Sequence, residues 1–239
     1  MTTAPAIRVA IQVSRGFAPV IAIFLAIVIP VFVGVGVISS ITDGEGSAWE
    51  IAATGAFKWF PFALAVLVTP AILPMYVTHG ATRHQFVAGA MLTLGAFALA
   101  VAAFLNLGYA VEAAIHQAAG RPYELRSPHL FESWTEVPLV VAEYALLLAA
   151  LLACGWLIGT LYYRLHWLWA TLLIPAAMAP AAGAELLLQT SWTGSWTESM
   201  GWTRPSLAVA LSVTTLLIGA TVAVVYALTR SVPIKLKAT

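Results

Sequence analysis

Apolar residues fill long stretches of this chain, and charged residues mark where these stretches end. The uncharged segments are 16–42, 59–82, 84–111, 144–163, 165–184 and 205–229. Each contains at least 20 residues, most of them Val, Leu, Ile, Ala and Phe. About 20 residues of helix are needed to cross the hydrocarbon core of a bilayer. Since isolated strands cannot satisfy their backbone in lipid, all six segments are expected to be helices.

The pattern therefore predicts an all-α polytopic membrane protein with a single transmembrane domain over residues 1–239. The predicted spans are about 16–40, 59–78, 86–111, 137–163, 166–187 and 205–229. Before the sixth span, the segment 178–204 has two interpretations, a re-entrant hairpin or an interfacial loop anchored by tryptophans. The longest polar connection, 112–136, is amphiphilic and is expected to pack on the outer membrane surface.

Residues 1–15 are predicted to form an amphipathic helix that lies flat at the inner interface. Three polar residues share one stripe at helical spacing, Arg8, Gln12 and Arg15. Ile7 and Ile11 lie on another face, as expected for an interfacial helix. The alternative is a frayed terminus with two arginines that set the orientation. The apolar run that begins near Phe17 is too long for a signal peptide and predicts a retained helix.

Lys and Arg are distributed unevenly between the two sets of connections. One set carries Arg8, Arg15, Arg83, Arg164, Arg230, Lys235 and Lys237. The other set carries Lys58, Arg121, Arg126 and Arg204, and all ten acidic residues lie on or near this second side. An excess of Lys and Arg marks the cytoplasmic side. The protein is therefore expected in the cytoplasmic membrane, with both termini inside.

Composition restricts the partners of the chain. It is 61% hydrophobic and 9% charged, with a formal net charge of +1, whereas soluble domains have about 25% charged residues. Much of its surface is therefore expected to contact the lipid bilayer. Nucleic acid is excluded as a partner because it requires a basic face. The single cysteine, Cys154, can form no internal disulfide and is expected to be a packing residue.

The motifs of common catalytic and nucleotide-binding sites are absent. The chain has no GxxxxGK[ST], no HExxH and no GxSxG. No catalytic residue, metal ligand or cofactor is therefore expected in it. The five histidines are interpreted as polar caps at the membrane edges: His79, His84, His116, His129 and His166. Glu143 and Glu185 lie toward the outer ends of spans, and either line an outer cavity or reach the outer interface.

Small residues and prolines indicate where helices pack and bend. Gly155 and Gly159 form a small-xxx-small pair, which lets two helices approach closely, either inside the fold or across a dimer. Pro70 and Pro74 are expected to kink the inner half of the second span and to form a hinge.

A small polar cluster, YVTHGATRHQFVAGA, lies between the second and third spans. Gly80 can end the second helix in a left-handed cap. Thr82 can begin a short helix by capping the amides of His84 and Gln85. Arg83 and His84 are then expected to project toward the cytoplasm, and Phe86 and Val87 to return the chain to lipid.

This cluster resembles the cytoplasmic loop of permease subunits of ABC-2 type (type V) exporters. In that family a G-x-[ST]-R segment, followed by a polar and a bulky apolar residue, forms a coupling helix that docks on the ATP-binding subunit. The corresponding residues here are Gly80, Thr82, Arg83, Gln85 and Phe86. The length and the six spans also resemble the small permeases of bacteriocin- and lantibiotic-immunity exporters. The 112–136 connection is larger than a minimal permease needs.

The resemblance implies a permease subunit that moves an apolar or amphiphilic substrate outward, such as a lipid, a peptide or a drug. ATP and Mg²⁺ would be bound by separate ATPase subunits, and a second permease, identical or homologous, would complete the pathway. Two alternatives remain open. One is a non-transporting scaffold or sensor. The other is a secondary transporter, which is disfavoured because the spans are almost free of ionisable groups.

Overall fold

The computed structural model describes residues 4–41 and 47–231, and the predicted inner-tail residues Lys235 and Lys237 lie outside them. The described residues form helices and connecting segments, without a strand. Six helical segments are long and apolar enough to cross a membrane. The prediction of an all-α polytopic membrane protein is thereby confirmed.

The first span is α1 (Ala4–Ile41), and the second consists of α2 (Ala48–Thr54), α3 (Ala56–Leu67), the π-helical turn η1 (Val68–Ile72) and α4 (Leu73–Thr78). The third is α5 (Arg83–Ala118) and the fourth is α6 (Val137–Arg164). The fifth is divided into α7 (Trp167–Leu172) and α8 (Ile174–Leu188). A short helix, α9 (Ser191–Ser199), precedes the sixth span, α10 (Leu207–Thr229).

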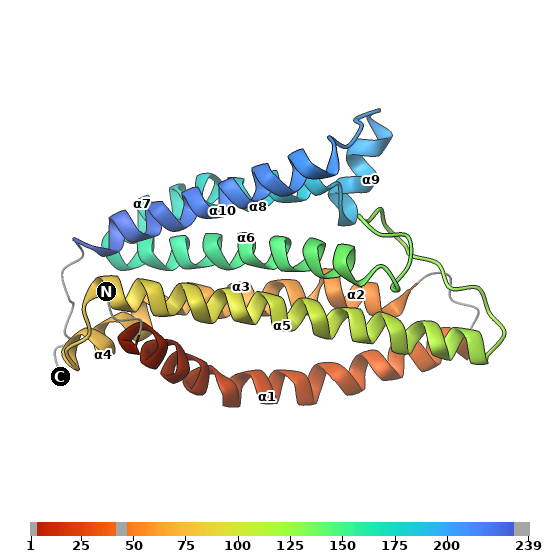
Figure 1. The fold of residues 1–239 in the computed structure, drawn as a ribbon, viewed down its shortest axis with the longest axis horizontal. Coiled ribbons are helices and arrows are strands. Elements are labelled where there is room, and N and C mark those ends of the chain that lie inside the picture. Colours follow the sequence, from red (N-terminus) through yellow and green to blue (C-terminus); the bar gives the residue numbers. More distant parts are fainter. Residues whose placement is uncertain (1–3, 42–46, 232–239) are drawn as a thin grey trace.

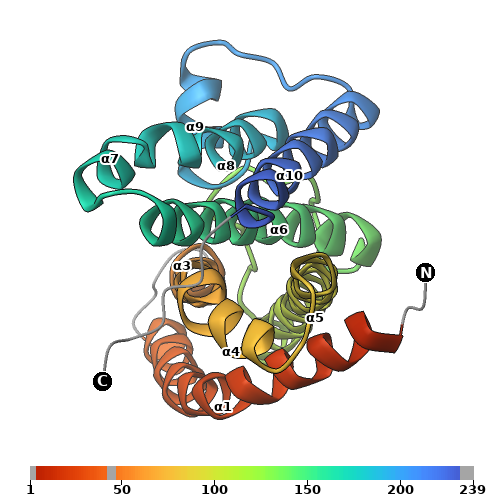
Figure 2. The ribbon, with the colours of Figure 1, turned by 90° about the vertical axis from the view of Figure 1, so that its left-hand side faces the viewer.

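Helix α6 forms the centre of the bundle. It packs against α3 and α5 on one side and against α8 and α10 on the other, whereas α1 lies at the periphery beside α5 (Figures 1 and 2). None of the residues in the most apolar 18-residue stretch of α1 is buried. The buried surface that holds the fold together therefore centres on α6, and α1 is the most weakly embedded span.

Helix α1 begins and α10 ends at the same end of the bundle (Figure 1). This end is named the arginine end after Arg83, Arg164 and Arg230. The opposite end is named the carboxylate end after four buried acids, Glu50, Glu112, Glu143 and Glu185. Because the chain runs from one end of the bundle to the other six times, the first span starts and the sixth span ends at the same end.

The predicted interfacial helix is continuous with the first span. Its first turns lie at an angle to the rest of α1 (Figure 1), and Pro19 inside the helix removes one backbone hydrogen bond there. Val9 and Val13 are buried against α5, whereas Ile7 and Ile11 are each 47% exposed. The face buried in the protein is thus distinct from the Ile7 and Ile11 face, which is free to contact the bilayer. The position of this segment in the bilayer stays a prediction.

The second span begins at Ala48, 11 residues before the predicted start at residue 59, because residues 48–54 are also helical. Ser47 caps α2 by accepting the backbone N–H of Glu50, and Glu112 of α5 accepts those of Ala48 (2.7 Å) and Trp49 (2.9 Å). A carboxylate at a helix N-terminus satisfies unpaired amides and interacts favourably with the helix dipole. The missed helix start depends on Glu112, which lies 64 residues after Ala48 and 63 residues after Trp49.

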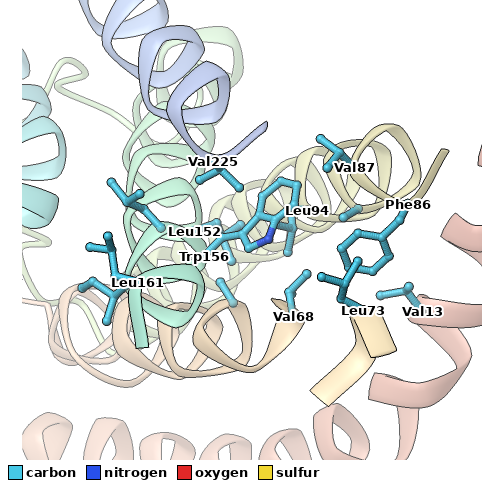
Figure 3. Packing of buried hydrophobic residues seen from close by; sticks show 14 of the residues in the cluster. Val13, Val68, Leu73, Phe86, Val87, Leu94, Leu152, Trp156, Leu161 and Val225 are labelled. Carbon is cyan, nitrogen blue, oxygen red and sulfur yellow. The ribbon is translucent and has the colours of Figure 1, made fainter. Parts of the chain in front are cut away.

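Trp156 of α6 is the largest fully buried side chain at the centre of the core. Figure 3 shows its ring between α5 and α10, near Leu94 and Val225. On another side of the same cluster, Phe86 lies beside Leu73 of α4 and Val13 of α1 (Figure 3). The core thus connects all six spans near the arginine end.

Between the fifth and sixth spans the chain forms one helix, α9, and not the two short helices of a re-entrant hairpin. Gln189 adopts a left-handed conformation (φ 49°) at the end of α8, which turns the chain into α9. Trp196 and Trp202 are 53% and 61% exposed. These features correspond to the alternative interpretation, an interfacial loop with tryptophans suited to the headgroup region.

Candidate functional site

The polar turn between α4 and α5 is the first candidate site. Gly80 has φ +87°, a conformation that glycine adopts without strain. Its N–H donates to the carbonyl of Val77 (3.1 Å), and the N–H of Ala81 donates to that of Tyr76 (3.0 Å). These bonds satisfy the last carbonyls of α4 and end the helix. The turn is consequently tight, with four residues, 79–82, between the two helices.

Thr82 and Gln85 begin the next helix by a reciprocal capping box. The Thr82 hydroxyl accepts the N–H of Gln85 (3.2 Å), and the Gln85 side chain accepts the N–H of Thr82 (3.0 Å). The helix that starts here is not short, since α5 continues to Ala118. The turn therefore has no separate coupling helix, and any movement of it would pass directly into the third span.

Phe86 and Val87 were expected to face lipid, but they face the interior of the helix bundle. Their side chains are 0% and 3% exposed, and they pack among Val13, Leu73 and the other buried residues of the core. The prediction was wrong because a residue directly after a helix start can face either the bilayer or the bundle, and α1 covers this face of α5. The apolar part of the motif thus belongs to the core.

Arg83 joins the turn to the end of the sixth span. Its guanidinium donates a hydrogen bond to the carbonyl of Arg230 (2.9 Å), and the exposed His84 ring contacts Tyr226 edge-on at 5.9 Å. Arg164 of α6 likewise donates to the carbonyl of Leu228 (2.9 Å). Cations at a helix C-terminus are stabilised by its unpaired carbonyls and by its dipole. The predicted docking residue is therefore also a link between the turn and α10.

The predicted hinge coincides with an irregular turn in the second span. Pro70 lies in the π-helical turn η1 and Pro74 in the first turn of α4. Thr69 of the same turn accepts a hydrogen bond from the Trp156 indole (2.9 Å) and lies 2.7 Å from the Thr160 hydroxyl. These contacts tie the turn to α6. Movement at this point stays a prediction, and it would have to act on α6 as well.

Gly155 and Gly159 lie where α6 meets α3 within one chain. A Cβ atom added at Gly155 would be 2.6 Å from the Phe62 carbonyl oxygen, and one at Gly159 would be 1.9 Å from that of Val66. Pro70 has no N–H to offer to the Val66 carbonyl four residues before it. Gly159 thus makes room for the Val66 carbonyl group, which receives no α-helical hydrogen bond from Pro70.

A buried polar cluster at the carboxylate end is the second candidate site. Glu143 is fully buried, and it accepts hydrogen bonds from His129 Nδ1 (2.7 Å) and from the backbone N–H of Leu130 (2.6 Å). The other His129 nitrogen lies 3.6 Å from Glu50 of α2. The prediction that Glu143 lines an outer cavity or reaches the interface is wrong, because His129 occupies its surroundings and pairs with it.

Glu185 is also paired and buried, instead of lining a cavity or reaching the interface. Its carboxylate contacts the ammonium group of Lys58 in α3, and each side chain is 10% exposed. The Thr193 hydroxyl of α9 lies 3.5 Å away. Burying one of these charges alone would be costly, whereas the pair compensates part of that cost. Lys58 therefore does not mark the start of the second span but lies inside it.

The connection after α5 folds over the ends of the helices and not over the membrane surface beside them. Glu50 accepts hydrogen bonds from the backbone N–H of Arg126 (2.6 Å) and from the Ser127 hydroxyl. Phe131 is 3% exposed and stacks on His129 at 4.6 Å between ring centroids. Acids of α2 and α6 thus hold residues 126–131 as a cap on the bundle.

His129 carries the charge that holds this cap. Burial alone would lower its pKa, but the adjacent carboxylates of Glu143 and Glu50 outweigh that effect and raise the pKa from 6.5 to about 9. The imidazole is therefore positively charged at neutral pH and lies between two acids. The interpretation of His129 as a polar cap at the membrane edge is wrong.

The stability of the cap is expected to depend on pH in one direction. A pKa raised by folding contributes stability that is complete below pH 6.5 and is lost as the pH rises through about 9. Unfolding of the purified protein in detergent, followed by circular dichroism, should therefore require less denaturant at pH 10 than at pH 7. The His129→Gln variant should lose this difference, while His166→Gln, at the exposed His166, should keep it. An unchanged pH profile in His129→Gln would contradict the assignment.

Sequence reasoning missed Glu50, Lys58, Glu112 and His129 as members of buried polar contacts. The sequence contained one signal of such contacts, because all ten acidic residues lie on or near the same side of the predicted membrane arrangement. So many acids at one end require partners there. Among residues 4–41 and 47–231, no group of three His, Cys, Asp or Glu side chains is arranged to hold a metal ion.

The two sites lie at opposite ends of the bundle, with capped backbone and arginines at one and paired carboxylates at the other. The chain matches no protein-family model, no curated protein and no solved structure.

Proposed function

We propose that the chain is the membrane-spanning permease subunit of an ATP-driven exporter, with the arginine end toward the cytoplasm. The observation that carries the proposal is the turn at residues 79–82, where a left-handed Gly80 and a capping box place Arg83 at the bundle end. A basic side chain in a rigid turn is suited to contact an acidic cleft on a soluble partner. The resemblance to the ABC-2 coupling segment supports the same assignment.

The contacts of the turn suggest how a partner's movement would be transmitted. Because the capping box joins Thr82 to α5 without a flexible link, displacement of the turn would tilt the third span. The Arg83 contact with the Arg230 carbonyl would carry the movement to the sixth span. The π-helical turn η1, with Pro70, would absorb the change in the second span.

The energy for transport would come from ATP and Mg²⁺ bound to separate ATPase subunits. A second permease, identical or homologous, would provide the other wall of the pathway. The described spans carry their ionisable side chains near the ends of the bundle, and most of the inner surfaces are apolar. An apolar or amphiphilic substrate fits such surfaces better than an ion does.

A non-transporting scaffold or sensor is the second candidate. The observation that favours it is the size of the turn, since residues 79–82 form no separate helix and offer a partner a small surface. In that case Arg83 would only orient the chain and bind the end of α10.

Purification of the tagged chain from its own host, after mild crosslinking, distinguishes the two candidates. A stoichiometric soluble ATPase in the mass spectrum is expected, together with a second membrane protein if the permease pair is heteromeric. Recovery of the chain without any ATPase, with crosslinking confirmed on a known complex, would contradict the exporter assignment.

Replacing Arg83 with glutamate is expected to abolish recovery of the ATPase. The change places a negative charge where an acidic partner would dock, and like charges in contact repel. The matched control is Arg15→Glu, which makes the same charge change at an exposed position of α1 near the same end. Both variants should insert and elute as folded protein in detergent, although Arg83→Glu also loses the hydrogen bond to the Arg230 carbonyl. If Arg83→Glu still recovers the ATPase at the parent level, the turn is not the docking site.

A further inference from the structure

Two apolar hollows lie side by side between α1 and the rest of the bundle. The larger, about 450 Å³, is an open groove lined by α1, α3 and α5, and a second of about 240 Å³ lies beside it toward the arginine end. Ser14, Ile21, Phe97 and Ala100 line both hollows, so the two are adjacent and share a wall. Together they are called the space beside α1. Ligand sites in proteins commonly have volumes of about 300–1,000 Å³.

The walls of this space are almost entirely apolar. Six phenylalanines line it, Phe17, Phe24, Phe57, Phe60, Phe97 and Phe104. The only hydroxyl groups are those of Ser14 and Thr93. The Thr93 hydroxyl already donates to the carbonyls of Ala10 or Gly89, at 3.2 and 3.0 Å. Among residues 4–41 and 47–231, no charged side chain lines the space, and water needs two to four polar partners to be held. The occupant must therefore be apolar.

Helix α1 keeps the space open because it is attached to the bundle on both sides of it. Toward the arginine end Val9 and Val13 are buried against α5, where Gly89 allows the close approach. Toward the carboxylate end Val28 and Phe32 pack on a second buried apolar cluster, which contains Phe57, Leu105 and Tyr109. Between these contacts α1 has its outer face exposed, with Ile23 62% and Ile27 61% accessible. In a bilayer this face is surrounded by hydrocarbon.

We propose that this space binds one acyl chain of a bilayer phospholipid. The space lies along the middle of three predicted spans, so the molecules that can reach it from beside α1 are those of the hydrocarbon core. An empty space of this size would lose dispersion contacts along its whole lining. An acyl chain is long, apolar and flexible, and two adjacent apolar hollows along α1 suit such a chain. The site is independent of the proposed exporter function, because it needs no partner subunit.

Photolabelling in a bilayer tests the assignment. The full chain is reconstituted into phosphatidylcholine vesicles that contain a small fraction of phosphatidylcholine with a diazirine midway along one acyl chain. After illumination, peptide mass spectrometry locates the labelled residues. Labelling is expected to be enriched at Ile21 and Phe97 relative to residues on the outer surface, such as Leu216 of α10, which is 71% exposed. Uniform labelling of all lipid-facing residues would overturn the proposal.

A variant that fills the space provides the second arm. Ala100→Trp places an indole in the hollow and is expected to abolish the enrichment at Ile21 and Phe97. The matched control is Leu99→Trp, which adds the same side chain one residue earlier, at a position that is 56% exposed. Enrichment that persists in a folded Ala100→Trp protein would overturn the site. If that variant fails to insert, Ala22→Trp fills the same space from the α1 side and must give the same loss.

Discussion

Replacing Lys58 with methionine is expected to destabilise the folded protein by about 3–5 kcal/mol, the usual cost of removing one partner of a buried ion pair. Glu185 would then be left with its charge at a position where its side chain is 10% exposed. The Thr193 hydroxyl, 3.5 Å away, is too distant to compensate the lost ammonium group. The free energy of unfolding, measured by denaturant titration in detergent micelles, checks the prediction.

The double variant Lys58→Met/Glu185→Leu is the control for this experiment. Replacing both members of a buried ion pair by apolar residues is often neutral or stabilising. The double variant should therefore recover most of the stability lost by Lys58→Met, and the two changes should be strongly non-additive. If the losses of the two single variants add, Lys58 and Glu185 do not form a functional pair.

The second large effect is expected from Gly159→Leu, which should prevent the native packing of α3 on α6. Even a Cβ atom at Gly159 would be 1.9 Å from the Val66 carbonyl oxygen, and three further carbon atoms have no space there. Overpacking of this kind commonly costs about 1–3 kcal/mol for smaller insertions, and more when backbone atoms must move. Size-exclusion chromatography and thermal unfolding in detergent should show an aggregated or strongly destabilised protein.

Gly95→Leu is the matched control, because Gly95 is an exposed residue of α5 with no atom within 4 Å of an added Cβ. The same substitution at that position should leave the elution volume and the unfolding temperature close to those of the parent. A Gly159→Leu protein that behaves like Gly95→Leu would show that α3 and α6 are not in contact at this point.

The six spans could be predicted from the sequence because their signal is local. A segment long and apolar enough to cross a bilayer is recognised without knowledge of its neighbours. The turn between the second and third spans is also local, since Gly80, Thr82 and Gln85 lie within six residues of one another. Its cap and capping box follow from backbone chemistry alone.

The buried polar contacts could not be predicted in the same way, because their partners are far apart in the chain. Lys58 and Glu185 are separated by 127 residues, and Glu50 is 76 residues from Arg126. A rule that ends a span at each charged residue places Lys58 at a boundary, whereas pairing lets it lie inside. The same rule missed α2, because the charge of Glu50 placed this residue outside a span. In the structure Arg126, Ser127 and His129 contact the Glu50 carboxylate, so that it can be buried.

The Phe86 prediction shows a third kind of limit. Both lipid and a protein core accept an aromatic side chain, so hydropathy does not distinguish them. Only the position of α1, which places Val13 near Phe86, decides that this face of α5 is internal. Hydropathy is therefore sufficient to locate a membrane-spanning helix, but which of its faces contacts the other helices depends on packing.

The long separation between Lys58 and Glu185 has a consequence for biosynthesis. At ribosomal rates of about 5–20 residues per second, the 127 residues between them take roughly 6–25 s to synthesise. During that interval Lys58 must enter the membrane without its carboxylate, with the adjacent Trp59 ring, 5.6 Å from its ammonium group, as a local partner. The ion pair can therefore form only after the fifth span has been synthesised, and nascent chains cut short before Glu185 should be substrates for membrane quality control.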